Sequence, residues 1–150
     1  MDIQGWYITP PDFDKSKKYP LILVIHGGPH AMYRPAFNYS WHQFASDGYV
    51  VLYTNPRGST GYGSEFANII DNDYPGAGDL SDLLAGVDHL TEEGFIDESR
   101  MYVQGCSGGG VLTAWVVGHD DRFAAAASLC PVTNWISMVG TTDTVSYTHL

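Results

Sequence analysis

Basic residues are scarce in this chain: Lys and Arg number 7 against 17 Asp and Glu, which gives a net charge of −10. So acidic a chain repels nucleic-acid phosphates and anionic lipid headgroups, which argues against nucleic-acid and membrane-surface partners. Long apolar runs are also missing, because the longest aliphatic stretch, Leu21–Ile25, is far too short to cross a bilayer.

Cysteine is equally rare. The chain has 2, Cys106 and Cys130, which cannot build a disulfide framework and leave the redox compartment open, cytoplasmic or periplasmic. A single bond between them is compatible with the sequence, though no pattern requires it. The first residues lack the basic-then-apolar order of a secretory leader. The oligomeric state has no signal in the sequence.

The rest of the composition is that of a globular chain. With 150 residues and 44% hydrophobic side chains, there is room for one domain with a modest core. Apolar runs predict buried strands over 21–25, 49–53, 101–104 and 123–129, and helical patterns cover about 38–46, 79–93 and 109–117. Strands and helices therefore alternate, which predicts an α/β fold: a mostly parallel sheet with helices on both faces.

The helix over 79–93 has the clearest pattern. Its apolar residues fall on one stripe, with Asp79 as the expected N-cap and Gly94 as the stop.

One motif carries chemistry. Gly105-Cys106-Ser107-Gly108-Gly109 matches G-x-S-x-G and lies between a predicted strand and a predicted helix. In that setting the turn is sharp, and it projects the serine hydroxyl above the sheet edge as a nucleophile. The same string alone also fits a Gly-rich turn, but the flanking strand and helix favour the nucleophile.

A second loop fits the same reaction. His26-Gly27-Gly28-Pro29 follows the first buried strand, and an attacking serine needs N–H donors for the oxyanion that it creates. In hydrolases of this type, one donor is the residue after the serine, here Gly108, and the other comes from such a loop, here Gly28.

Three segments together, His26–Pro29, Asn55–Gly63 and Gly105–Gly110, resemble the prolyl oligopeptidase family of serine peptidases, especially its acylaminoacyl-peptidase-like and dipeptidyl-peptidase-like branch. The resemblance runs from about Gly5 to about Asp143. It implies that residues 1–150 are the N-terminal part of an α/β-hydrolase catalytic domain, which normally follows a β-propeller. It also implies peptide substrates and acyl transfer by a Ser-Asp-His triad, with Ser107 as nucleophile and Gly28 and Gly108 in the oxyanion hole. No cofactor or metal is implied.

The acid and base of that triad are not expected in this chain. They follow the serine in this fold, but only His119 and His149 lie beyond Ser107. His119 falls about 18 Å away at the far end of the next helix. His149 lies in a terminal stretch, Val145–Leu150, that no longer resembles the family. We therefore expect a truncated domain with an exposed strand edge, inactive by itself.

Two other functions stay open: a carboxylesterase or lipase, which uses the same serine and oxyanion loop, and a catalytically inert module. Among the remaining residues, Arg57 is expected to tie its Gly-rich loop to neighbouring backbone. Cys106 is expected to pack as a small residue beside the nucleophile. His30 and Tyr62 could each line a substrate subsite or lie in a surface loop.

Overall fold

The computed structural model describes residues 1–142, so the predictions for Val145–Leu150 and His149 lie outside the described residues. Five strands form one sheet in the order β1-β3-β2-β4-β5. The strands are β1 (Gln4–Ile8), β2 (Tyr19–Ile25), β3 (Val50–Asn55), β4 (Ile96–Cys106) and β5 (Ala125–Leu129). The helices are α1 (Tyr39–Ser46), α2 (Ser64–Asn68), α3 (Ala77–Glu92), α4 (Gly108–His119) and α5 (Trp135–Thr141).

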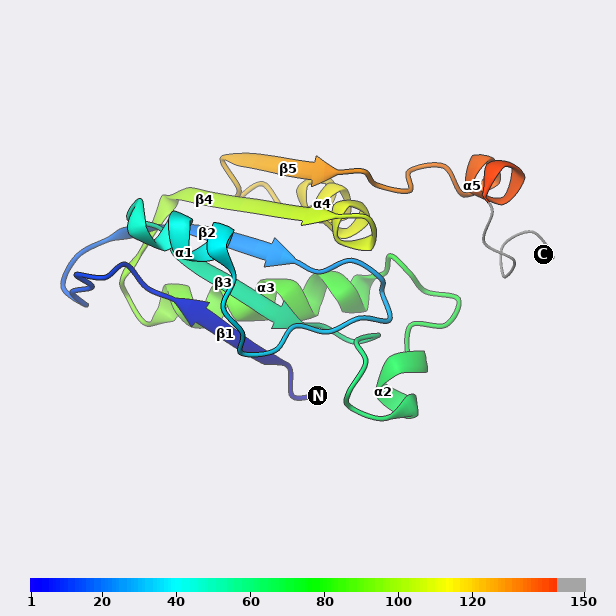
Figure 1. Ribbon diagram of the computed structural model, residues 1–150, viewed down its shortest axis with the longest axis horizontal. Coiled ribbons are helices and arrows are strands. Elements are labelled where there is room, and N and C mark those ends of the chain that lie inside the picture. Colours follow the sequence, from blue (N-terminus) through cyan, green and yellow to red (C-terminus); the bar gives the residue numbers. More distant parts are fainter. Residues whose placement is uncertain (143–150) are drawn as a thin grey trace.

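The sheet is mostly parallel, as predicted. β2 pairs in parallel with both β3 and β4, and β4 pairs in parallel with β5. The exception is β1, an antiparallel edge strand on β3 that the apolar pattern had not marked. Because the parallel strands point the same way, the loops after β2, β3, β4 and β5 gather at one end of the sheet (Figure 1).

Helices cover both faces of the sheet, which explains the unbroken apolar run of β2. Alternate residues point to opposite faces of a strand, so Leu21 and Leu23 pack with α3 and α4, whereas Ile22 and Val24 pack with Trp41 of α1. Each fully buried leucine stabilises the fold by about 1.5–3 kcal/mol. The predicted α/β layering is thus confirmed.

One detail of the sequence prediction was wrong. Helix α3 begins two residues before Asp79, at Ala77, and its N-cap is Gly76. Asp79 lies one turn inside, where its carboxylate accepts the Gly76 N–H at 2.8 Å.

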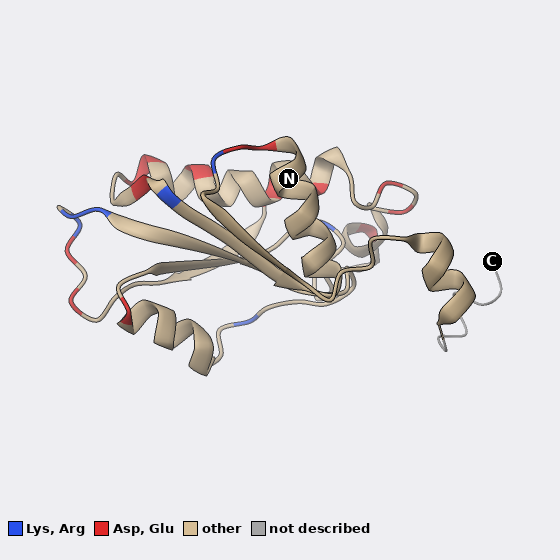
Figure 2. Ribbon diagram, turned by 90° about the horizontal axis from the view of Figure 1, so that it is seen from above, with Lys and Arg blue, Asp and Glu red and all other residues tan. Residues whose placement is uncertain are grey.

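The acidic residues are spread over α3 and the loops, whereas basic residues are few (Figure 2). Within residues 1–142, no helix combines the length and apolar character needed to cross a bilayer.

Candidate active site

Ser107 occupies the turn between β4 and α4. The strand ends at Cys106 and the helix begins at Gly108, so Ser107 alone makes the reversal, with φ 59° and ψ −121°. Residues other than glycine rarely adopt a positive φ because it strains the backbone. Backbone strain of this kind is typical of functional positions. Ser107 is exposed. Its backbone N–H donates to the carbonyl of Leu129, the last residue of β5, at 2.9 Å.

Glycines allow this turn to be so tight. A Cβ on Gly105 would lie 2.9 Å from the Cα of Gly109, and closer still to its carbonyl, because α4 folds back directly over the end of β4. The G-x-S-x-G spacing therefore has a steric reason: larger residues at either end would push the strand and helix apart.

The loop after β2 reaches the same point. A Cβ on Gly108 would lie 2.9 Å from the nitrogen of Gly28, and a Cβ on Gly27 would lie 3.4 Å from Ser107 Cβ. Gly28 itself has φ +119°, a conformation that favours glycine. The fold thus brings together Ser107, Gly28 and Gly108, the three residues that the sequence singled out, and the N-terminus of α4 adds a positive helix end.

His26, at the base of this loop, is buried and fixed at both ring nitrogens. Its Nδ1 donates to the Gly27 carbonyl at 2.7 Å, and its Nε2 lies 2.9 Å from Ser59 Oγ. Burial lowers the pKa of His26, which favours the neutral ring, and the bond to Gly27 opposes this only in part. The side chain therefore supports the loop and is not free to contact Ser107.

Arg57 anchors the loop after β3, but to a different partner from the one expected. Its guanidinium forms a bidentate pair with the buried carboxylate of Asp82 in α3, at 2.9 and 2.8 Å, and its own N–H donates to the same carboxylate. The expected tie to neighbouring backbone is therefore wrong. Asp82 lies 25 residues from Arg57 in the sequence, so no local sequence pattern indicated this ion pair.

Asn55 is a supporting residue that the sequence analysis missed. Its side chain is fully buried and bonds to both the N–H and the carbonyl of Tyr33, which ties the loop after β2 to the end of β3. It also donates to the Tyr62 hydroxyl, which in turn donates to Gln4. Tyr62 thus has a structural role, and His30 bonds to the carbonyl of Gly58.

Within residues 1–142, the histidines are hydrogen-bonded to groups other than Ser107 or lie on other elements. His119 ends α4 and bonds to the carbonyl of Trp115, so it lies at the opposite end of the helix from Ser107, as expected. His42 bonds within α1. None of the hydrogen bonds of these rings goes to Ser107.

Cys106 is not packed, contrary to expectation. It is exposed, and its Sγ lies 2.6 Å from Sγ of Cys130, which is also an exposed free thiol. Cys106 and Ser107 are both exposed.

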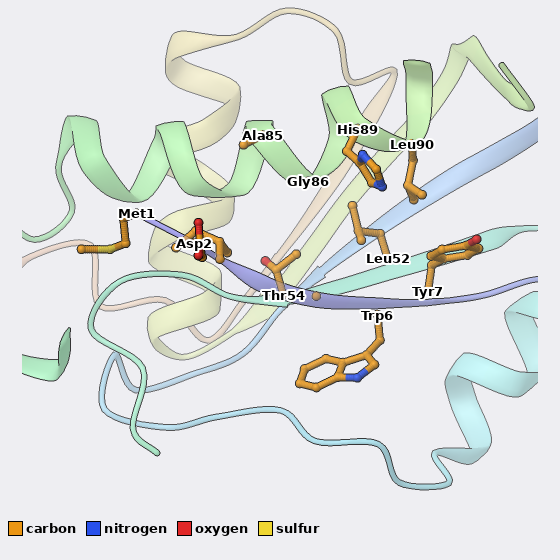
Figure 3. A pocket seen from close by; sticks show the side chains of 12 residues that line it. Met1, Asp2, Trp6, Tyr7, Leu52, Thr54, Ala85, Gly86, His89 and Leu90 are labelled. Carbon is orange, nitrogen blue, oxygen red and sulfur yellow. The ribbon is translucent and has the colours of Figure 1, made fainter. Parts of the chain in front are cut away.

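A cavity of about 460 Å³ lies between β1 and α3, and Figure 3 shows His89 and Leu90 of α3 facing Leu52 and Tyr7 across it. Strand β2 separates this cavity from β4, so it is remote from Ser107. The hydroxyl of Thr54, on its lining, is buried without a hydrogen-bond partner.

Comparison with known proteins decides the family. The model of the prolyl oligopeptidase family matches residues 35–149, more than half of the chain. The chain belongs to the prolyl oligopeptidase family. The resemblance inferred from the three motifs is thereby confirmed.

Relatives within the family extend the match to nearly the whole chain. It is 43% identical to the uncharacterized peptidase YuxL of Bacillus subtilis over 142 residues, which is 94% of this chain and 22% of that protein. It is also 43% identical to the acylamino-acid-releasing enzyme of Arabidopsis thaliana over 143 residues, 94% of this chain and 19% of that enzyme.

A solved structure shows the same fold. The uncomplexed acylaminoacyl peptidase of Pyrococcus horikoshii superposes with a TM-score of 0.87 at 35% identity, over 95% of this chain and 23% of that one. The predicted α/β-hydrolase fold is thus confirmed. This chain spans about a fifth of the length of the relatives it matches, 22% and 19%.

Proposed function

We propose that this chain carries the nucleophile of a serine peptidase that cleaves peptides by acyl transfer. The observation that carries the proposal is the backbone of Ser107, at φ 59° and ψ −121° between β4 and α4, where a Cβ on Gly27 of the loop after β2 would lie 3.4 Å from Ser107 Cβ. In the proposed reaction, Ser107 Oγ attacks the peptide carbonyl, and the N–H groups of Gly28 and Gly108 stabilise the resulting oxyanion.

The proposal assigns residues 1–150 to the N-terminal part of the catalytic domain. The base that takes the Ser107 proton is then a histidine outside residues 1–142, oriented by an aspartate that is also outside them. A β-propeller before residue 1 belongs to the same proposal and rests on the family resemblance. The 22% share of the related peptidase YuxL leaves room for all three.

Covalent labelling tests the nucleophile. In the full-length protein, a fluorophosphonate should label Ser107, and Ser107→Ala should abolish both labelling and peptide hydrolysis, with kcat falling by about 10³-fold or more. Ser99→Ala is a matched control, because this hydroxyl is exposed and bonds to Asp97, near the start of β4 and away from Ser107 at its end. Labelling that survives in Ser107→Ala would contradict the proposal.

The substrate class needs a separate comparison. The relatives are named as acylamino-acid-releasing enzyme and peptidase, but a carboxylesterase would use the same serine and oxyanion loop. A peptidase should have the higher kcat/KM on an acylated aminoacyl arylamide, and an esterase on a nitrophenyl ester. Turnover of neither substrate, without labelling of Ser107, would favour the inert module.

A further inference from the structure

The two cysteines meet at the carboxyl ends of neighbouring strands. Cys106 is the last residue of β4, and its register partner across the ladder is Leu129, so Cys130 is the next residue beyond β5. Cys130 has φ 40°, which turns the chain there. The two Sγ atoms lie 2.6 Å apart and both residues are exposed.

We infer that Cys106 and Cys130 form an oxidisable dithiol, which peroxides convert reversibly into an intrachain disulfide beside Ser107. A disulfide needs its sulfurs at about 2.05 Å, so closure moves them by only about 0.5 Å. The parallel pairing of β4 with β5 already holds the two strand ends in place, so no strand has to move.

The reaction balances with hydrogen peroxide as oxidant. One thiolate attacks a peroxide oxygen, the O–O bond breaks, and a sulfenic acid and hydroxide form; the hydroxide is protonated to water. The second thiol then attacks the sulfenic sulfur, the S–S bond forms, and a second water leaves. Two thiols lose two electrons in total, and one peroxide gains them. A dithiol reductant reverses the step by exchange.

The position of the pair gives the bond a local effect. Cys106 precedes Ser107, and Cys130 follows Leu129, whose carbonyl accepts the Ser107 N–H. A disulfide would therefore lie next to the hydrogen bond from the Ser107 N–H to the Leu129 carbonyl, which joins the turn to β5. It would fix the turn covalently to β5, which is an edge strand of the sheet among residues 1–142.

The oxidation of Cys106 by peroxide should be slow at neutral pH, because its thiol is mostly protonated there. The hydrogen bond with Cys130, then partial desolvation, raises the pKa of the Cys106 thiol, and only the thiolate attacks peroxide. Disulfide closure should therefore accelerate as the pH rises above neutrality.

Peptide mapping of the full-length protein tests the inference. Trypsin cleaves after Arg100 and Arg122, so it separates Cys106 from Cys130 into different peptides. After peroxide treatment and alkylation of the remaining thiols, we expect both cysteines to escape alkylation and their two peptides to be found joined. Dithiothreitol should restore both alkylated peptides.

Two controls make the result specific. In Cys106→Ser or Cys130→Ser, the remaining cysteine should appear as a trappable sulfenic acid, with no joined peptides. In a glutathione buffer, the equilibrium constant for disulfide formation should be about tenfold or more larger in the folded protein than in the urea-unfolded protein. The reason is that the fold holds the two thiols together. Separate oxidation of each cysteine in the folded protein, or equal closure when unfolded, would overturn the inference. None of these readouts requires peptidase activity.

Discussion

Ser107 holds a backbone conformation that costs free energy for any residue with a side chain. Strain of this kind amounts to about 1–3 kcal/mol and persists because the surrounding structure enforces it. Here β4, α4 and the glycines at 105 and 109 leave the chain no other path through the turn. The backbone conformation that the proposed chemistry needs at Ser107 therefore lowers the stability of the fold.

Two substitutions at Ser107 separate strain from chemistry. Both Ser107→Gly and Ser107→Ala remove the hydroxyl, but only glycine relieves the strain at φ 59°. We expect Ser107→Gly to be more stable than Ser107→Ala by about 1 kcal/mol, after the larger unfolded-state entropy of glycine is subtracted. Urea unfolding of the two variants measures the difference. Equal stabilities would mean that the turn is not strained.

Gly28 offers a comparable test of the proposed oxyanion loop. Its φ is +119°, and a Cβ would lie 2.7 Å from the nitrogen of His30, so Gly28→Ala should displace the loop and its N–H. We expect kcat of the full-length protein to fall by about 10²-fold or more. Gly48→Ala is the matched control: its φ is +93°, but no atom lies within 4 Å of the added Cβ. It should lose a little stability and keep its kcat.

The buried carboxylate of Asp79 should make the stability of the protein depend on pH. Burial is the main cause that raises its pKa from 3.8 to about 6, and its Oδ1 has no hydrogen-bond partner. The folded state therefore binds more protons than the unfolded state between these two values. Stability should fall as the pH rises through this window, by about 2–3 kcal/mol in total, and the loss should persist at pH 7.

Asp79→Asn tests this pH dependence. The amide oxygen can still accept the Gly76 N–H, but the side chain no longer ionises. We expect the variant to be more stable than the parent above about pH 6, with a flatter stability profile between pH 4 and 7. Chemical denaturation at several pH values gives both profiles. Parallel profiles would show that Asp79 is not the group responsible.

At the scale of elements, α3 and the loop after β3 depend on one ion pair. Asp82 is 5% exposed in its side chain, and it accepts two bonds from the Arg57 side chain and one from the Arg57 backbone. Such a pair is costly to break from one side, because the remaining charge stays partly buried without a partner. The loop that it holds includes Ser59, which contacts His26 beneath the oxyanion loop.

Asp82→Ala should therefore destabilise the protein by about 2–4 kcal/mol and also lower kcat through the displaced loop. Glu93→Gln is the control, since its pair with Lys15 is largely exposed and should contribute less than about 1 kcal/mol. Urea midpoints and kcat of both variants test this. If Asp82→Ala changed neither the urea midpoint nor kcat, the loop would be held by its other contacts.

At the scale of the whole molecule, β5 leaves one edge of the sheet open. All five of its residues are exposed, and its outer side has no strand among residues 1–142 (Figure 1). Unprotected edges of this kind pair readily with other chains. The predicted open edge is thus present in the described part of the fold.

We expect residues 1–150, expressed by themselves, to self-associate. Light scattering after size-exclusion chromatography should show particles larger than the 16.4 kDa monomer. Ala127→Lys, in the middle of β5, should reduce this association, because an edge lysine opposes strand pairing. A monomer with a sharp cooperative melt would contradict the expectation.

The layered α/β arrangement and the candidate site at Ser107 could both be predicted from short stretches of sequence. An unbroken apolar run such as 21–25 has to be covered on both faces, and a serine between glycines at a strand-to-helix junction has to turn sharply. These are local constraints, so the α/β alternation, Ser107, Gly28 and Gly108 could be read from short segments. Strand β1 was missed because its alternation is weak and its place depends on β3.

The contacts between residues far apart in the chain could not be predicted and come from the folded structure. Arg57 with Asp82, Asn55 with Tyr33 and Cys106 with Cys130 each join segments far apart in the chain. The physical reason is that a hydrogen bond or thiol pair depends on distances set by sheet register and helix packing. No spacing along the sequence records those distances.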